Sequence, residues 1–314
     1  MRNRAEHATH PHGVGLFLKG MAMGAADLIP GVSGGTIALI TGIYDELIQS
    51  ISNLHPRLLV QLKQNGWKQF WNEANGSFFL LLLSGIATSV LAFSSLLHFL
   101  LEEHRTFLFS FFFGLVAFSV PMIAREVKEW NLKTIGIGIL GTVIAFGIGS
   151  LPAMTVDPGL GYLVLCGSVA ACAMILPGIS GSFILLLLGV YPHVIGALKS
   201  FDVVRIAAVG IGAVVGLLLF SRVLKLALER HHSVILSLLA GFLLGSLQSL
   251  WPWKEPLTLL YTHSDGRETW SMINALPPAG DLALIIACVG FCVAGGLLVH
   301  GLQRWSQGKK HPVR

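Results

Sequence analysis

The sequence predicts an all-α integral membrane protein built from two inverted repeats, each a re-entrant helical hairpin followed by three transmembrane helices. First, 54% of its 314 residues are hydrophobic and 12% are charged, with a mean hydropathy of +0.72. Soluble domains carry roughly 25% charged residues. Second, a Pro-Gly-x-Ser-Gly motif occurs twice. Third, six other apolar stretches are each long enough to cross a bilayer.

The duplicated motif predicts two broken helices. Residues 30–34 read Pro-Gly-Val-Ser-Gly, and residues 177–181 read Pro-Gly-Ile-Ser-Gly, at an offset of 147. Pro-Gly ends one helix, and Ser-Gly begins the next with N–H groups that lack helical partners. The apolar segment after each break is about half as long as a full span. We therefore expect re-entrant hairpins at 14–51 and 161–198.

The remaining apolar stretches divide equally between the two repeats. At an offset of 127, Glu102 matches Glu229 and Gly114 matches Gly241. Each repeat, 14–151 and 161–301, therefore contains a hairpin and three spans. Three is an odd number, so the second repeat is predicted to be inverted relative to the first. The predicted spans are 77–100, 106–124, 134–151, 204–224, 233–251 and 282–301.

The basic residues predict the orientation. If the N-terminus is cytoplasmic, 16 of the 21 Lys and Arg residues fall on the cytoplasmic side, as the positive-inside rule requires. A polar tail at 1–13 and a basic tail at 302–314 are then both cytoplasmic. The five basic residues predicted outside are Arg105, Lys199, Arg205, Lys254 and Arg267.

The first repeat carries an insert at 52–76 that the second repeat lacks. Trp67, Phe70 and Trp71 lie there among Lys and Gln residues, a pattern typical of an amphipathic helix at the membrane interface. An ordinary cytoplasmic loop is the alternative, and the sequence leaves both open.

The two hairpin tips form the candidate site. The N-terminus of a helix attracts anions through its dipole and its free N–H groups, so two such ends that face each other predict a phosphate site near the midplane. Breaks that serve only packing are the alternative. The candidate phosphate-binding residues are Gly31, Val32, Ser33, Gly34, Gly35, Thr36, Gly178, Ile179, Ser180, Gly181 and Ser182.

Charged residues near the tips are few. Asp27 has no acidic counterpart in the second repeat, and a carboxylate at this depth is a candidate for binding a coupling proton or sodium ion. A local cap, or a pair with Lys19, is the alternative. Glu46 (matched by His193), Glu102, Glu229 and Arg222 are candidates for gating. For the three carboxylates, solvated helix ends or turns are the alternative, and for Arg222 it is snorkelling to the interface.

Motifs of enzymes and of metal sites are absent from the sequence. It contains no nucleophile elbow, Walker loop or HExxH motif, which argues against an enzyme, including a membrane phosphatase. Cys288 and Cys292 share a helix face, but packing thiols explain them better than a metal pair. We therefore expect no cofactor, no metal and no nucleic-acid partner.

The two motif regions resemble a bacterial membrane family that was long a domain of unknown function. The resemblance is carried by residues 26–36, Ala-Asp-Leu-Ile-Pro-Gly-Val-Ser-Gly-Gly-Thr, and by residues 173–185 with Gly189-Val190-Tyr191. That family is associated with polyprenyl-phosphate transport. The resemblance implies a flippase in the bacterial cytoplasmic membrane that returns undecaprenyl phosphate from the outer to the inner leaflet for cell-envelope synthesis.

Only the resemblance supplies the polyprenyl tail. The residues themselves point to an anion held between the tips, with access alternating as one repeat rocks against the other. A channel or ion-coupled exchanger for a small inorganic anion is therefore the alternative function.

Overall fold

The computed structural model describes residues 13–29, 31–55, 57–154, 156–262, 268–278 and 280–307. The predicted N-terminal tail, most of the predicted C-terminal tail and Pro30 lie outside the described residues. The first half contains α1 (Gly13–Asp27), α2 (Gly34–Ile40), α3 (Tyr44–Asn53), α4 (Arg57–Glu73), α5 (Gly76–Glu103), α6 (Arg105–Ala124) and α7 (Leu132–Ser150). The second half contains α8 (Leu160–Ile175), α9 (Gly181–Leu187), α10 (Tyr191–Ser200), α11 (Val203–Ser246), a short 3₁₀ helix (Leu247–Leu250), β1 (Lys254–Thr262), β2 (Glu268–Asn274) and α12 (Leu282–Gln307).

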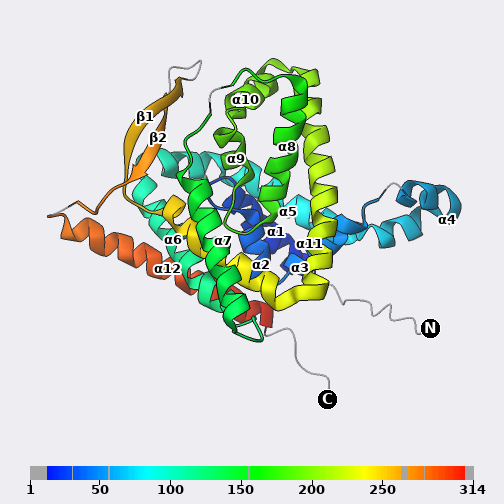
Figure 1. Ribbon diagram of the computed structural model, residues 1–314, viewed down its shortest axis with the longest axis horizontal. Coiled ribbons are helices and arrows are strands. Elements are labelled where there is room, and N and C mark those ends of the chain that lie inside the picture. Colours follow the sequence, from blue (N-terminus) through cyan, green and yellow to red (C-terminus); the bar gives the residue numbers. More distant parts are fainter. Residues whose placement is uncertain are drawn as a thin grey trace.

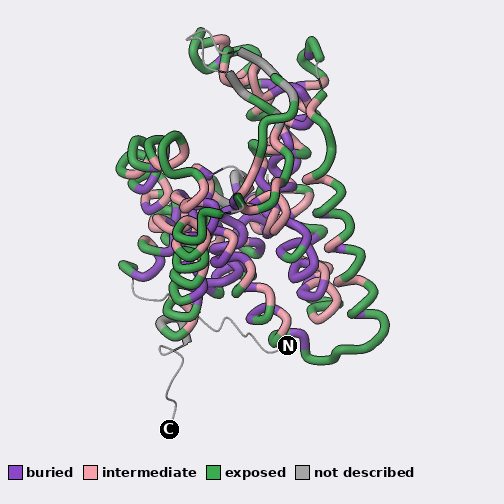
Figure 2. Tube along the Cα trace, turned by 90° about the vertical axis from the view of Figure 1, so that its left-hand side faces the viewer, coloured by how far each residue is buried: buried purple, intermediate pink, exposed green. Residues whose placement is uncertain are grey.

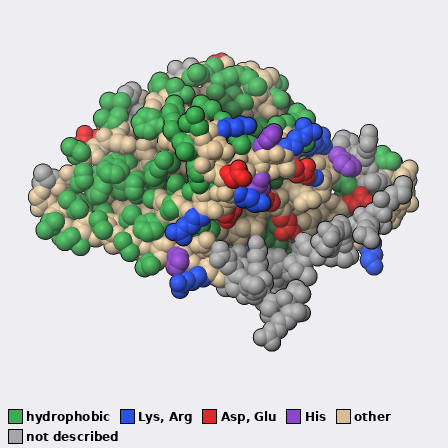
Figure 3. Space-filling view, turned by 60° about the horizontal axis from the view of Figure 1, so that its bottom comes forward, with side chains coloured by type: hydrophobic (Ala, Val, Ile, Leu, Met, Phe, Trp, Pro, Cys, Tyr) green, Lys and Arg blue, Asp and Glu red, His purple; other side chains and the backbone are tan. Residues whose placement is uncertain are grey.

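Helices occupy every predicted span. Five described helices, α5, α6, α7, α11 and α12, are long and apolar enough to cross a membrane. The long α11 is broken at His231, whose φ of −138° and ψ of 47° are not helical, so it supplies both the fourth and the fifth predicted spans. Apolar side chains such as Leu91 and Leu132 are more than four-fifths exposed. Figure 3 shows broad hydrophobic areas beside a zone where charged and His side chains gather. The chain is a multi-pass membrane protein.

Apart from α4 in the first half and the 3₁₀ helix and β1–β2 hairpin in the second, the two halves repeat the same order of elements (Figure 1). Helices α1 and α8 have 15 and 16 residues, α2 and α9 have seven each, and α3 and α10 have ten each. The backbone matches at the breaks, because Gly31 and Gly178 both have positive φ, 89° and 83°. His104, between α5 and α6, has φ −131° and ψ 32°, close to the values at His231.

The third long helix of each half packs against the other half. Helix α12 packs on α6, and α7 packs on the part of α11 after His231. Glycines allow these close crossings: a Cβ added to Gly114 would collide with the Cys292 carbonyl, and one added to Gly241 would collide with the Gly138 carbonyl. The two halves are therefore interlocked rather than side by side.

The core surrounds the first broken helix. All seven residues of α2 are buried, and Ile29, Val32 and Tyr44 belong to the main hydrophobic cluster. Figure 2 shows the buried segments gathered in the middle of the molecule and the exposed ones along its outer helices. In α9, by contrast, only Ile184 and Leu187 are buried.

Two elements refine the sequence prediction. Strands β1 and β2 form an antiparallel pair in which Lys254 lies opposite Asn274, so the prediction of a purely helical protein is incomplete. Both strands contain β-branched and aromatic residues, such as Thr258 and Tyr261 in β1 and Trp270 and Ile273 in β2, and these residue types favour strands. Most of the insert is the helix α4, which has a kink at Gly66 (φ 78°). Its place at the membrane interface stays a prediction.

Candidate functional site

At the first tip, residues 28–36, side chains of the protein itself already bind N–H groups at the start of α2. Ser33 is the N-cap of α2, and its Oγ accepts a hydrogen bond from the Gly35 N–H at 3.1 Å. The Gly34 N–H donates to Asp27 Oδ1 at 2.6 Å. The Asp27 carboxylate therefore sits where an external anion would bind, and the capping role expected as one alternative for Asp27 is present. Lys19 donates from Nζ to the Thr41 carbonyl at 2.7 Å.

The two tips are in direct contact. Ser33 Oγ donates to the Met174 carbonyl at 3.1 Å, at the end of α8. The Gly178 N–H donates to Thr36 Oγ1 at 3.0 Å. Gly35 lies so close to α8 that an added Cβ would stand 2.6 Å from the Ile175 carbonyl oxygen. The hydrogen-bonding groups of the first tip thus join the two tips.

The second tip, residues 175–183, is open. Among the described residues, no side chain accepts a hydrogen bond from the first N–H groups of α9. Ser180 Oγ and Ser182 Oγ lie 2.9 Å apart, and Ser182 is exposed. A cavity of about 290 Å³ opens at this point between α8, α9 and α11. Its lining includes Asp27, Met174, Ser180, Gly181 and Ser182.

The candidate residues therefore divide into three groups. Ser180, Gly181, Ser182 and Asp27 line the cavity of the second tip. A second group joins the tips or is buried: Ser33, Thr36 and Gly178 form hydrogen bonds between the tips, and Val32, Gly34 and Gly35 are buried. Gly31 is half-buried and lines a different cavity. Ile179, at 6% exposure, is a core residue of the second tip and does not line this cavity.

The predicted gating residues lie elsewhere. Glu46 accepts a hydrogen bond from Asn75 Nδ2 at 3.2 Å. Arg222 Nη2 donates to the Leu54 carbonyl at 3.2 Å. Glu102 lies 3.3 Å from His98 on the surface. None of these residues lines the cavity of the second tip.

Glu229 lines a separate cavity of about 160 Å³ together with Asp45, Lys225 and His232. His232 Nε2 lies 3.8 Å from Asp45 Oδ2. This charged cavity shares no lining residue with the cavity of the second tip.

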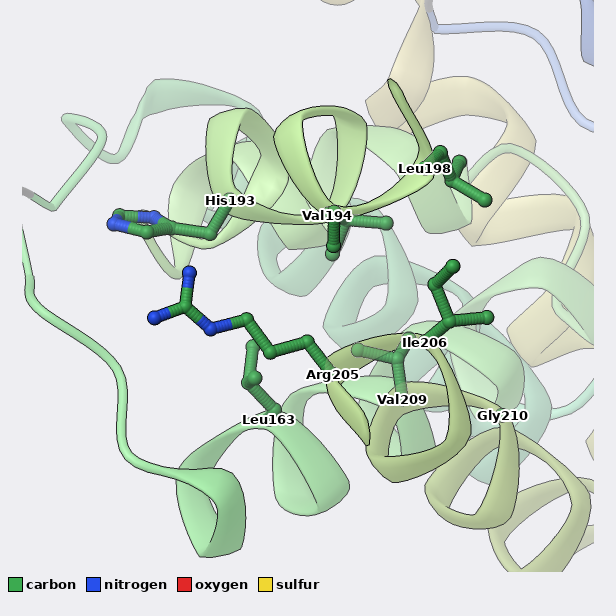
Figure 4. Close-up of a pocket in the computed structure, with 9 residues that line it drawn as sticks. Leu163, His193, Val194, Leu198, Arg205, Ile206, Val209 and Gly210 are labelled. Carbon is green, nitrogen blue, oxygen red and sulfur yellow. The ribbon is translucent and has the colours of Figure 1, made fainter. Parts of the chain in front are cut away.

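A further cavity of about 210 Å³ lies between α10 and the start of α11 (Figure 4). The polar ends of His193 and Arg205 turn toward each other at one side, and Arg205 Nε also lies 3.5 Å from Asp202 Oδ2. Val194 and Ile206 line its apolar part. Val209 lines both this cavity and that of the second tip, so the two adjoin along α11.

Sequence reasoning did not single out a cavity that Arg105 and Lys254 line. Both were expected only as basic residues outside the membrane, yet they line a cavity of about 190 Å³ that reaches Gly31 of the first tip. The strand β1 brings Lys254 there, and that strand was not recognised. The β-branched and aromatic residues Thr258, Tyr261 and Thr262, followed by the pair Asp265-Gly266 that is typical of hairpin turns, were the available sequence pattern.

Comparison with known proteins identifies the family. The model of a family described as undecaprenyl phosphate translocase-like matches residues 23–268. The chain belongs to this family. No solved structure matches the chain.

Two relatives of this translocase-like chain carry the same name. A polyprenyl-phosphate transporter of Vibrio cholerae is 45% identical over 302 residues, which cover 93% of this chain and 96% of the relative. A polyprenyl-phosphate transporter of Staphylococcus aureus is 34% identical over 255 residues, 75% of this chain and 85% of the relative. The resemblance seen in the motif regions is confirmed.

Proposed function

We propose that this protein is a flippase that carries undecaprenyl or another polyprenyl phosphate from the outer to the inner leaflet of the bacterial cytoplasmic membrane. The observation that carries the proposal is the 45% identity to a polyprenyl-phosphate transporter over nearly the whole of both chains. The absence of catalytic motifs from the sequence agrees with transport that leaves the lipid chemically unchanged. In this proposal the protein has the orientation that the positive-inside rule predicts, with both chain ends in the cytoplasm.

In this proposal the phosphate binds at the second tip. The uncapped N–H groups at the start of α9 and the hydroxyls of Ser180 and Ser182 offer donors on one cavity, which suits a phosphate group. The first tip holds the second in place through Thr36 and Ser33. This differs from two equivalent tips, because the Asp27 carboxylate already occupies the first.

Asp27 gives a reason for coupling. It lines the same cavity as Ser180 and Ser182, so its negative charge would repel a phosphate in a site of low dielectric. A proton or a sodium ion on Asp27 would remove that repulsion. We infer that one of these ions is bound together with the lipid phosphate.

The tail stays in lipid while the phosphate crosses. Met174 lines the cavity and is 49% exposed. Together with the apolar residues around it, it offers the isoprenoid chain an apolar surface. In our mechanism the repeats are inverted and the hairpins are re-entrant. The site opens to each side of the membrane in turn as one group of packed helices moves against the other. Because α12 packs on α6 and α7 packs on α11, each moving unit contains a helix from the other half of the sequence.

Reconstitution tests this function. The protein is placed in liposomes with labelled polyprenyl phosphate, and the lipid reaching the opposite leaflet is measured. We expect transport by the intact protein and a strong loss in the Ser180→Ala, Ser182→Ala double variant. Ser95→Ala, which removes an exposed hydroxyl on α5, is the matched control. No lipid movement by the intact protein, together with uptake of a labelled inorganic anion, would instead establish the small-anion function.

A further inference from the structure

Two adjoining cavities lie under the β1–β2 hairpin. They measure about 190 and 270 Å³, and Arg105, Lys254 and Met272 line both. Since one water occupies about 30 Å³ in the liquid, either cavity has room for a phosphate group. Figure 1 shows this hairpin at the top of the molecule, as it also shows α10.

The two cations that line both cavities are held close together without a carboxylate partner. Lys254 Nζ donates to Asn274 Oδ1 at 2.8 Å and to the Gln248 carbonyl at 3.3 Å. Arg105 Cζ lies 5.2 Å from the centre of the Phe109 ring. Among the described residues neither cation forms an ion pair, although Glu255 lines the larger cavity. Burial, and then the charge of Arg105, lower the pKa of Lys254 to about 8.

A third donor in the same wall lacks an acceptor. The Nε1 atom of Trp253 is buried and has no hydrogen-bond partner among the described residues, and Trp253 lines the larger cavity. A buried donor left unpaired is unfavourable. Neighbouring Trp251, by contrast, donates to the Ala275 carbonyl at 2.8 Å. Two cations and one unpaired N–H therefore surround a space that suits an anion with several acceptor oxygens.

The smaller cavity connects this charged wall to the transport path. Gly31 of the first tip lines it, together with the apolar side chains of Phe183 and Leu187 from the second hairpin. A phosphate bound beside Arg105 would thus lie in the same cavity as these apolar side chains and as Gly31 of the first tip. Arg105 is itself exposed, so a ligand can reach it.

We propose that Arg105, Lys254 and Trp253 form a second phosphate site, on the extracytoplasmic side, which captures the phosphate monoester headgroup of the lipid before it passes to the hairpin tips. This inference rests on the proposed function for its lipid and its direction. The chemistry it requires, a phosphate monoester with two or more free oxygens, is shared with inorganic phosphate. The test therefore includes both.

Binding is measured first, on the full chain in detergent. A short-chain polyprenyl phosphate is titrated and thermal unfolding is recorded, with the same polyprenol lacking phosphate as the ligand control. We expect Arg105→Gln and Lys254→Gln each to weaken affinity about tenfold or more, the scale of one charge-assisted hydrogen bond. Trp253→Phe, which removes only the N–H, should weaken it less. Lys199→Gln removes an exposed cation at the end of α10 and should leave affinity unchanged.

The outcomes separate this site from the transport function. Unchanged affinity in the Arg105→Gln, Lys254→Gln double variant, with its unliganded unfolding temperature intact, would overturn the inference even if transport persists. Inorganic phosphate that binds as tightly as the lipid would overturn the lipid assignment. Lipid binding that depends on Arg105 and Lys254 supports the inference, even if liposomes show no transport and the proposed function fails.

Discussion

Replacing Asp27 with Asn separates the two roles of this carboxylate, the cap and the ion carrier. The side chain keeps an oxygen that can accept the Gly34 N–H, now held at 2.6 Å, but it loses its charge. A hydrogen bond to a charged group contributes about 1.5–3 kcal/mol and a neutral one about 0.5–1.5. The expected loss of stability is therefore about 1 kcal/mol. Asp27→Ala leaves the buried Gly34 N–H unpaired and should cost about 1–3 kcal/mol.

Transport then distinguishes the roles. In liposomes carrying an imposed proton or sodium gradient, we expect Asp27→Asn to remain folded but to lose the response of lipid transport to the gradient. Asp202→Asn is the matched control, because Asp202 also caps a helix, accepting from the Arg205 N–H at 3.1 Å, but lies away from the tips. A gradient response that survives in Asp27→Asn would refute the coupling role and leave Asp27 as a cap alone.

Three further predictions concern the tips and the outer cavity. Thr36→Val should destabilise the protein by about 1–3 kcal/mol, because it leaves the Gly178 N–H unpaired, whereas Thr36→Ser should not; thermal unfolding checks both, and equal stability would show that this bond is dispensable. Gly35→Ala should separate the tips and reduce transport, since its Cβ would overlap the end of α8; normal transport would mean that the tips need no close contact. Phosphate-lipid affinity should fall as pH rises from 7 to 9, because Lys254, with its pKa lowered to about 8 by burial and by Arg105, loses its charge while a phosphate monoester, with a second pKa of about 6, stays doubly charged; constant affinity would exclude Lys254 as a ligand.

The sequence predicted the helical elements well because their causes are local. Runs of apolar residues set the spans, and Pro-Gly-x-Ser-Gly set both breaks. The positive φ angles of Gly31 and Gly178 are the kind that glycine alone adopts readily. These properties depend on a few neighbouring residues, so one sequence is enough to find them.

The inequivalence of the tips was less predictable, because it arises from contacts between distant residues. Ser33 and Ser180 hold the same place in the motif, yet only Ser33 caps its helix and reaches the other hairpin. Asp27 was singled out, but its bond to Gly34 depends on how the chain turns between them. The cavity lined by Arg105 and Lys254 was not predicted, because residues 149 positions apart come together only through the fold.

The interlocked packing of the two halves also governs how the protein assembles as it is made. Helix α6 meets its glycine-lined partner surface on α12, where Gly295 in turn packs against the Phe111 carbonyl. Because α12 is the last described helix of the chain, it can cover the Gly114 face of α6 only after all the preceding helices have been synthesised. A chain truncated before α12 would lack the partner of this face, so we expect the preceding long spans to pack incompletely without the last one.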